Sequence, residues 1–501
     1  MSATDARTAP PAGRLLPPEV SRVVWLLLAA AFVTILNETT MGVAIPHLID
    51  DLGITAVAAQ WLTTAFMLTM AVVIPITGFL LQRFTTRQMF IAAMSLFSLG
   101  TLTAAAAPGF EMLLLARIVQ ASGTAIMMPL LMTTLMDVVP PHARGRMMGR
   151  VSIVMALAPA IGPSLSGFLL DTLSWRWIFA VVLPIALLSL AMGARWIHNL
   201  GETTHAPIDV LSVVLSAFGF GGLVYGFSQV GEAGTRGETA SDAAEQGVAT
   251  VSLTVALVVG VVGLGLFVWR QVHLQRVDDA LLDLRVFRSR NFTAAIVQMA
   301  LLAFVFFGSL TVLPLFLQRA MELSAFESGL AVLPGALLMG VAGPFIGRVY
   351  DARGTRILLV PGGFLAASML WVFTAFTLET PLWIVVVAHT LLSLGLTLSF
   401  TPLFTASLAS LERHYYSYGS AVVGTVQQVV GAAGIALLVA VMSAVSAGAL
   451  TDGASAAAAE AAGAHAAFLV AAIIGLPVVV GAFFVRTPDD ELDDEAVAFA
   501  H

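Results

Sequence analysis

Apolar segments that are long enough to cross a membrane dominate this chain of 501 residues. Fourteen runs of roughly 20 mainly apolar residues, the length that spans a bilayer as a helix, follow one another between residues 23 and 485. Only 11% of the residues are charged, whereas soluble domains carry roughly 25%. Because only helices or closed barrels satisfy the backbone inside a bilayer, these runs predict an all-α polytopic membrane protein with fourteen transmembrane helices.

The basic residues predict the orientation of the chain. All 23 of them are arginines, and nineteen fall in tails and loops on the same side as the N-terminus. Arg176, Arg236 and Arg319 fall on the opposite side, and Arg117 lies within the fourth apolar run. Loops rich in basic residues stay in the cytoplasm, so we expect both termini to be cytoplasmic.

Several chemistries find no support in the sequence. The chain has no cysteine, which excludes disulfides and thiolate catalysis. It contains no glycine-rich loop that ends in Gly-Lys-Ser/Thr, so transport driven by ATP is not supported. No Ser/His/Asp set with a recognisable context points to an enzyme. We therefore expect no cofactor, no metal site and no nucleic-acid partner.

The chain carries an internal repeat. Residues recur at a constant offset of 269 positions: Gly78, Arg87 and Gly162 match Gly347, Arg356 and Gly431. Repeated halves with a site at their interface are the architecture of secondary transporters. The predicted organisation is a cytoplasmic tail (1–22), a six-helix bundle (23–197), a linker with two additional spans (198–291), a second six-helix bundle (292–485) and an acidic cytoplasmic tail (486–501).

Four sequence motifs carry a resemblance to a known family. They are Leu36-Asn37-Glu38-Thr39 in the first span, Gly78 with Arg83 and Arg87 after the second, Arg117 with Gln120 in the fourth, and Pro159, Gly162, Pro163 and Gly167 in the fifth. With Gln427, Gln428 and Gly431 in the thirteenth span, the chain resembles the fourteen-spanner drug:proton antiporters of the major facilitator superfamily, and most closely their lincomycin-exporter-like branch.

The resemblance implies a function and a set of partners. A member of this family exports small amphiphilic drugs or antibiotics across the bacterial cytoplasmic membrane by alternating access. Proton entry drives the export, so no cofactor is needed. The expected partners are the substrate, protons and membrane lipids, and the expected state is a monomer.

The chain departs from the family pattern at two places. Gln82 stands in the first loop motif where an acid is usual, whereas the second copy keeps Asp351. Asn37 stands where the first span usually has aspartate, and the acid is displaced by one residue to Glu38. A shift of one residue rotates a helical side chain by about 100°, so a different helix face carries the acid.

Glu38 is the main candidate for the proton site. It lies well inside the first span, Val23 to Pro46, where an ionised side chain costs about 2.5–3.5 kcal/mol or more. Arg117 lies at a similar depth. A carboxyl group out of water holds a proton more readily, and a nearby guanidinium favours its release. We predict that Glu38 binds the proton, that Arg117 tunes it, and that Asn37 and Gln120 complete the hydrogen bonding. The alternative is a permanent structural ion pair between the two spans.

Two further groups are candidates for gating. The loop-motif residues are Gly78, Arg83, Arg87 and Asp137 in the first half and Gly347, Asp351 and Arg356 in the second. We predict that Arg83 or Arg87 latches to Asp137 on the cytoplasmic side; the alternative is that these arginines only set the topology. In the fifth span, Pro159, Gly162, Pro163 and Gly167 predict a kinked, closely packed helix that seals the inner half of the pathway.

Substrate contacts are harder to predict, because most of the membrane-embedded surface is apolar. Polar side chains inside spans face protein or water, and flexible Met and large aromatic residues suit varied ligands. The candidates are Met41, Trp61, Phe66, Gln298, Phe304, Gln427 and Gln428. The sequence leaves open two alternatives: export of one metabolite or self-made antibiotic, and a polytopic membrane enzyme.

Overall fold

The computed structural model describes residues 17–197, 199, 209–235 and 243–487. Over these residues the chain is helical and contains no β-strand. Fourteen helical segments are long and apolar enough to cross a membrane. The predicted fold class and number of spans are confirmed.

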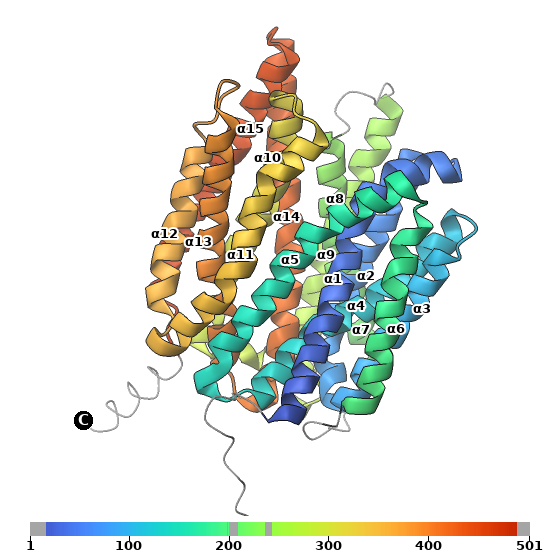
Figure 1. Cartoon of the computed structure of the whole chain (residues 1–501), viewed down its shortest axis with the longest axis vertical. Coiled ribbons are helices and arrows are strands. Elements are labelled where there is room, and N and C mark those ends of the chain that lie inside the picture. The colour runs from blue at the N-terminus through green and yellow to red at the C-terminus, as the bar shows by residue number, and fades with distance from the viewer. Residues whose placement is uncertain (1–16, 198, 200–208, 236–242, 488–501) are drawn as a thin grey trace, which may run out of the picture.

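Two bundles of six helices stand side by side (Figure 1). The first consists of α1 (Pro18–Leu52), α2 (Ala56–Arg83), α3 (Thr86–Ala105), α4 (Phe110–Val138), α5 (Arg144–Thr172) and α6 (Arg176–Trp196). The second consists of α10 (Arg290–Leu315), α11 (Ala325–Arg353), α12 (Arg356–Phe373), α13 (Leu382–Ala409), α14 (Tyr416–Thr451) and α15 (Ala456–Gly481). A π-helical turn, Phe316–Ala320, extends α10.

The helix bounds follow the offset seen in the sequence. Ala56, the first residue of α2, corresponds at 269 positions to Ala325, the first residue of α11. The helix that follows begins at Thr86 in the first half and at Arg356 in the second, a difference of one residue from the same offset. Helices α1 to α6 therefore match helices α10 to α15 in order.

The first helix is longer than predicted. We expected it to end near Pro46, but α1 continues through this proline to Leu52 and stops at Gly53, whose φ of 62° is left-handed. Proline costs a helix one N–H, and packed neighbours in a membrane bundle make that loss tolerable.

The additional helices lie against one side of the two bundles. They are α7 (Val210–Ser216), a π-helical turn (Ala217–Gly221), α8 (Gly222–Thr235) and α9 (Ala243–Leu274). Helix α8 packs against both α14 and α2, and α9 packs behind α8. The ring of Tyr225 stacks on Trp61 of α2 at 5.7 Å. The additional helices therefore cover the line where α2 meets α14.

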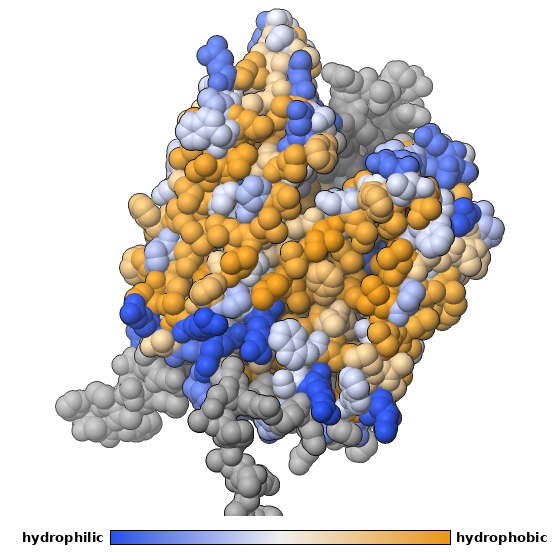
Figure 2. All heavy atoms as spheres, viewed as in Figure 1, coloured by the Kyte–Doolittle hydropathy of each residue, from blue (hydrophilic) through white to orange (hydrophobic). Residues whose placement is uncertain are grey.

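The two ends of the molecule differ. We call the end at which α1 begins and α15 stops the arginine-rich end; it lies at the bottom of Figure 1. Helices α5 and α11 cross near this end and diverge toward the other (Figure 1). Figure 2 shows the surface hollowed between the bundles at the opposite end, above a broad apolar belt.

Candidate functional site

A buried arginine organises a polar cluster inside the first bundle. Arg117 on α4 is 1% exposed. Its Nη1 donates to Gln120 Oε1 at 2.7 Å and to Asn37 Oδ1 at 3.2 Å, and its Nε donates to the Leu62 carbonyl at 3.5 Å. The guanidinium carbon lies 4.1 Å from the centre of the Phe66 ring. Neutral groups therefore hold the cation in place, as a polar residue inside a membrane bundle requires.

Glu38 lies beside this cluster but is not bonded to it. Within the described part of the chain, its carboxylate makes no hydrogen bond, while the adjacent Asn37 binds Arg117. The charges of Glu38 and Arg117 are still close enough to interact. Glu38 is partly exposed, whereas Asn37 is fully buried. The structure brings the four predicted residues together, with Asn37 as the direct partner of the arginine.

The cluster continues to a third helix. Gln120 donates through Nε2 to Thr101 Oγ1 on α3 at 2.8 Å. The Nδ2 group of Asn37 is buried and has no acceptor among the described residues. One donor next to Glu38 is therefore unsatisfied in this conformation, and a buried polar group without a partner is costly.

At the arginine-rich end, α5 meets α11 through backbone contacts. Asp351 on α11 accepts hydrogen bonds from the backbone N–H groups of Gly145 and Arg146, at 2.7 and 2.9 Å, and from Arg146 Nε at 3.1 Å. A carboxylate at the positive end of a helix is stabilising. A Cβ on Gly343 would lie 2.7 Å from the carbonyl oxygen of Gly149, and one on Gly347 would overlap that of Gly145.

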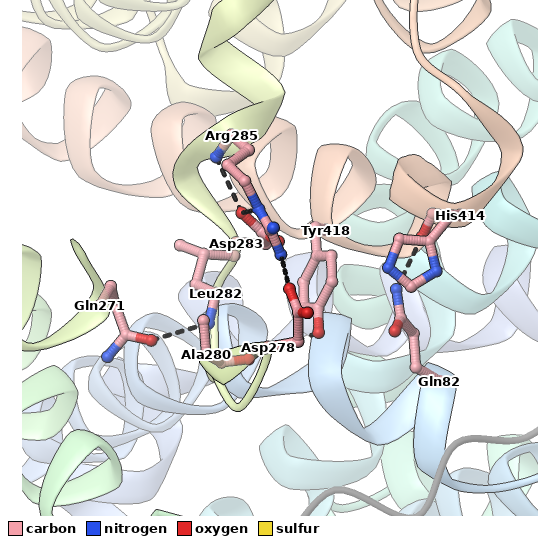
Figure 3. A network of polar contacts seen from close by, with 9 residues as sticks. All are labelled: Gln82, Gln271, Asp278, Ala280, Leu282, Asp283, Arg285, His414 and Tyr418. Atoms are coloured by element: carbon pink, nitrogen blue, oxygen red, sulfur yellow. Dashed lines mark hydrogen bonds and ion pairs between the residues drawn. The ribbon is translucent and has the colours of Figure 1, made fainter. Parts of the chain in front are cut away.

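The second contact between the bundles, α2 with α14, is different. Gln82 Nε2 donates to the carbonyl of His414 at 2.7 Å. Figure 3 shows this pair beside the segment that joins α9 to α10, where Arg285 binds Asp283 and Asp278, each at 2.6 Å. These hydrogen bonds raise the pKa of Arg285 further above its usual value. The linker therefore reaches the base of the α2/α14 contact.

The structure shows Asp137 paired with a different arginine from the two predicted for the latch. Arg87 donates instead to the carbonyl of Ala194 at 2.7 Å. Asp137 accepts from Arg413 Nε at 2.9 Å, which joins α4 to the turn before α14. The guanidinium carbon of Arg83 lies 6.0 Å from the centre of the Phe84 ring. The acid is correctly placed between the bundles, but its partner Arg413 comes from the second half, and pairing between distant halves leaves no local sequence signal.

The motif of the fifth span also lies elsewhere than expected. Helix α5 begins at the arginine-rich end, so Pro159, Gly162, Pro163 and Gly167 fall in its other half. Gly162 packs against Thr39, and Ser166 Oγ donates to the Thr40 carbonyl at 2.9 Å, both on α1.

The seal at the arginine-rich end is made by other residues of α5 and α11. Four glycines follow a Gly-x-x-x-Gly spacing in both helices: Gly145, Gly149, Gly343 and Gly347. Gly347 was predicted as a loop-motif residue, whereas the other three were missed by sequence reasoning. That spacing, a known signal of close helix contact in membranes, could have found them.

The predicted substrate contacts fall into two groups. Met41 and Phe66 are buried within the first bundle, Gln298 is buried between α10 and α15, and Trp61 stacks on the additional helix. The residues that are partly exposed in the second bundle are Phe304, Gln427 and Gln428.

An aromatic cluster lies near these partly exposed residues on the same helices or their neighbours. Phe306 contacts Phe307 at 5.0 Å and Phe400 of α13 at 5.9 Å between ring centres. All three rings are partly exposed. Phe400 was not predicted, since no motif marks it. The cluster offers an apolar, aromatic surface of the kind that ligand pockets use.

Comparison with known proteins identifies the family. A family model described as "Major Facilitator Superfamily" matches residues 27–435. The chain belongs to the major facilitator superfamily. It is therefore a multi-pass membrane transporter and not an enzyme.

Relatives from bacteria cover almost the whole chain. An uncharacterized MFS-type transporter, YcnB, of Bacillus subtilis is 41% identical over 93% of this chain and 95% of its own length. The lincomycin resistance protein LmrB of the same organism is 38% identical over 93% and 96%. A multidrug resistance protein B homolog of Mycobacterium tuberculosis is 30% identical over 83% and 75%. The resemblance to drug-efflux transporters of this superfamily is confirmed.

Solved structures support the fold. The human organic anion transporter MFSD10 superposes with a TM-score of 0.62, covering 94% of this chain and all of its own, at 14% identity. The proton:xylose symporter XylE gives 0.61, covering 93% and 96%, at 13% identity. At this identity the likeness concerns the fold alone.

Proposed function

We propose that this transporter is a drug:proton antiporter that exports amphiphilic compounds from the bacterial cytoplasm. The observation that carries the proposal is Glu38, a membrane-embedded carboxyl group next to a buried cation to which it is not bonded. The relatives that are named for lincomycin and multidrug resistance support the direction and the substrate class.

The geometry around Glu38 suits reversible protonation. Arg117 keeps its hydrogen bonds to Asn37 and Gln120 whether or not Glu38 carries a proton. The cost of a charged carboxylate in the membrane favours proton uptake, and the fixed positive charge favours release. A change of solvent access between two conformations shifts the balance between these terms. A carboxylate locked in an ion pair would not respond in this way.

The orientation follows from the positive-inside bias. With both termini in the cytoplasm, the closed arginine-rich end is the cytoplasmic end and the hollow faces outward. In this state a proton reaches Glu38 from outside, and a bound compound leaves. Rocking of the bundles would then open the cytoplasmic end. A monomer without a cofactor suffices for this cycle, which the proton gradient drives.

The second bundle supplies the proposed substrate surface. Phe306, Phe307 and Phe400 give an adaptable aromatic wall, and Gln427 and Gln428 give polar groups on α14. We assign no acidic residue of the second bundle to this substrate surface. We therefore expect neutral or singly charged amphiphiles to be preferred.

Transport in proteoliposomes tests the proposal. Protein is reconstituted with an imposed proton gradient, and movement of a lincosamide or a fluorescent dye is measured for wild type, Glu38→Gln and Glu38→Asp. We expect gradient-driven transport in wild type, at least a tenfold loss in Glu38→Gln, and partial activity in Glu38→Asp, which keeps an ionisable group. Exchange of two substrate pools without a gradient should survive in Glu38→Gln.

A second variant separates proton coupling from a structural ion pair. In the double variant Asn37→Asp, Glu38→Asn, the acid takes the position that contacts Arg117 directly. We expect a stable protein that no longer couples to the gradient, because the pair holds the acid in its charged form. Full proton-driven export by Glu38→Gln would contradict the proposed role of Glu38.

A further inference from the structure

A groove of about 860 Å³ lies between α10 and α15 on the outside of the second bundle. Its apolar walls come from Val297, Leu301, Leu476, Val480 and Phe484. Val480 is 60% exposed and Phe484 is 67% exposed. Because apolar side chains this exposed belong to the membrane-facing surface of such a protein, the groove opens toward lipid.

The groove lies at the depth of one leaflet. The span that begins at Arg290 has 31 residues, which is about 46 Å of helix against about 30 Å of hydrocarbon. Its first residues therefore lie among the lipid headgroups. The groove extends from Arg290 to Leu301 along α10, about 16 Å, which matches a single leaflet. In the orientation proposed above, this is the cytoplasmic leaflet.

The mouth of the groove is cationic. Arg290 lines it and is exposed. Within the described ranges, its side chain makes no hydrogen bond or ion pair. The neighbouring Asn291 accepts from the N–H of Arg486 at 2.7 Å and donates to its carbonyl at 2.8 Å, and so fixes the segment after α15 beside Arg290. The positive charge of Arg290 therefore lies beside a segment that hydrogen bonds hold in place.

A buried polar residue also lines the groove. Gln298 is 1% exposed and lines the groove. Its Nε2 donates to the Val478 carbonyl, and its Oε1 has no partner among the described residues. Residue 481 must be small here, since a Cβ on Gly481 would overlap this oxygen. Gln298 lies eight residues, about 12 Å along α10, from Arg290, so it borders the deeper, apolar part of the groove.

We propose that this groove is a binding site for an anionic phospholipid of the cytoplasmic leaflet. The phosphate lies at Arg290, and one acyl chain fills the apolar walls between α10 and α15. Anionic lipids are attracted to basic residues at this surface, which selects phosphatidylglycerol over a zwitterionic lipid.

Lipid retention measured by native mass spectrometry tests the site. The full chain is released from detergent with equal amounts of phosphatidylglycerol and phosphatidylethanolamine. We expect wild type to retain phosphatidylglycerol preferentially and Arg290→Gln to bind it about fivefold more weakly, the effect of one cation near an anionic surface. Val297→Trp, which fills the groove but keeps Arg290, should abolish retention of the tightest-bound lipid.

A matched control removes an arginine elsewhere at the same end. Arg22→Gln on α1 changes the net charge equally but lies outside the groove, so it should retain the lipid as wild type does. Unfolding temperatures without added lipid should agree among all variants. Equal retention of the two lipids by wild type, or equal loss in Arg22→Gln and Arg290→Gln, would overturn the proposal. The proposal would also be overturned if wild type showed no preference between the two lipids and an exported drug displaced the bound lipid.

Discussion

Two of the contacts between the bundles, α5 with α11 and α2 with α14, occupy equivalent places in the repeat but are built from different chemistry. Asp351 and Gln82 are 269 residues apart, and each lies in the last turn of its helix. Asp351 accepts two backbone N–H groups at the start of α5, whereas Gln82 donates to one carbonyl before α14. The hydrogen bonds of Asp351 are therefore charged, whereas that of Gln82 is neutral.

The glycines of the two contacts differ in the same sense. A Cβ on Gly343 would press on the backbone of Gly149 at 2.7 Å, whereas one on Gly78 would meet its nearest atom, the Ala421 Cβ, at 3.1 Å. Both contacts are tight, but the α5/α11 backbones lie closer together than those of α2 and α14. We expect α2 and α14 to separate first when the arginine-rich end opens, with α5 and α11 holding longer.

The largest effect is expected from Gly347→Ala. The added methyl overlaps the carbonyl of Gly145, and overpacking of this kind costs about 1–3 kcal/mol. We expect the arginine-rich end to stay open and transport to fall at least fivefold. Because the chain lacks cysteine, spin labels at His142→Cys and Arg353→Cys report the distance across the contact. Gly340→Ala, whose Cβ would lie 3.8 Å from Ala156, is the control and should behave as wild type.

Asp351→Asn should have the next largest effect. The amide keeps the shape of the side chain but removes the charge at the start of α5, an interaction worth about 0.3–2 kcal/mol. The same spin-label pair should show the closed population falling several-fold. An unchanged distance distribution would mean that the glycine packing alone holds this contact.

Gln82→Ala should have a smaller effect. It removes one hydrogen bond to the His414 carbonyl, worth about 1 kcal/mol. Labels at Phe84→Cys and Glu412→Cys should show a widening of the α2/α14 contact, while the labels across α5/α11 should not move. Movement of both pairs together would show that the two contacts open as one.

The smallest effect is expected at the surface ion pair. Arg413 is 69% exposed in its pair with Asp137, and exposed pairs contribute about 0–1 kcal/mol. Asp137→Arg alone should lower transport modestly, and adding Arg413→Asp should restore it. If Arg87→Asp, rather than Arg413→Asp, restored transport to Asp137→Arg, the functional partner of Asp137 would be Arg87, as predicted from the sequence.

Hydropathy and repetition predicted the fold well because each signal is local. A membrane span has to be apolar along its own length, and the offset of 269 residues follows the helix starts of α2 and α11. The contact of Arg117 with Gln120 was also predictable, since residues three apart share a helix face. What remained out of reach was which faces of distant helices meet.

Two residues illustrate that limit. Asp137 was identified as a gate residue, but its partner Arg413 lies 276 positions away, where many arginines were equally plausible. Asn37, which the family pattern treats as a departure, turned out to be the direct ligand of Arg117. A one-residue shift moves the acid to another helix face, and only the packed bundle shows which neighbour each face meets.

The glycine contact of α5 with α11 has a consequence for energy use. Two backbones in direct contact leave no cavity that could hold a water molecule. Protons cross a protein along chains of hydrogen-bonded water molecules, so a contact without water does not conduct them. In the proton-driven cycle proposed here, an outward-facing molecule without cargo would therefore not short-circuit the membrane. In Gly347→Ala, the added methyl group would keep this contact from closing, and protons would then leak inward and dissipate the gradient that drives export.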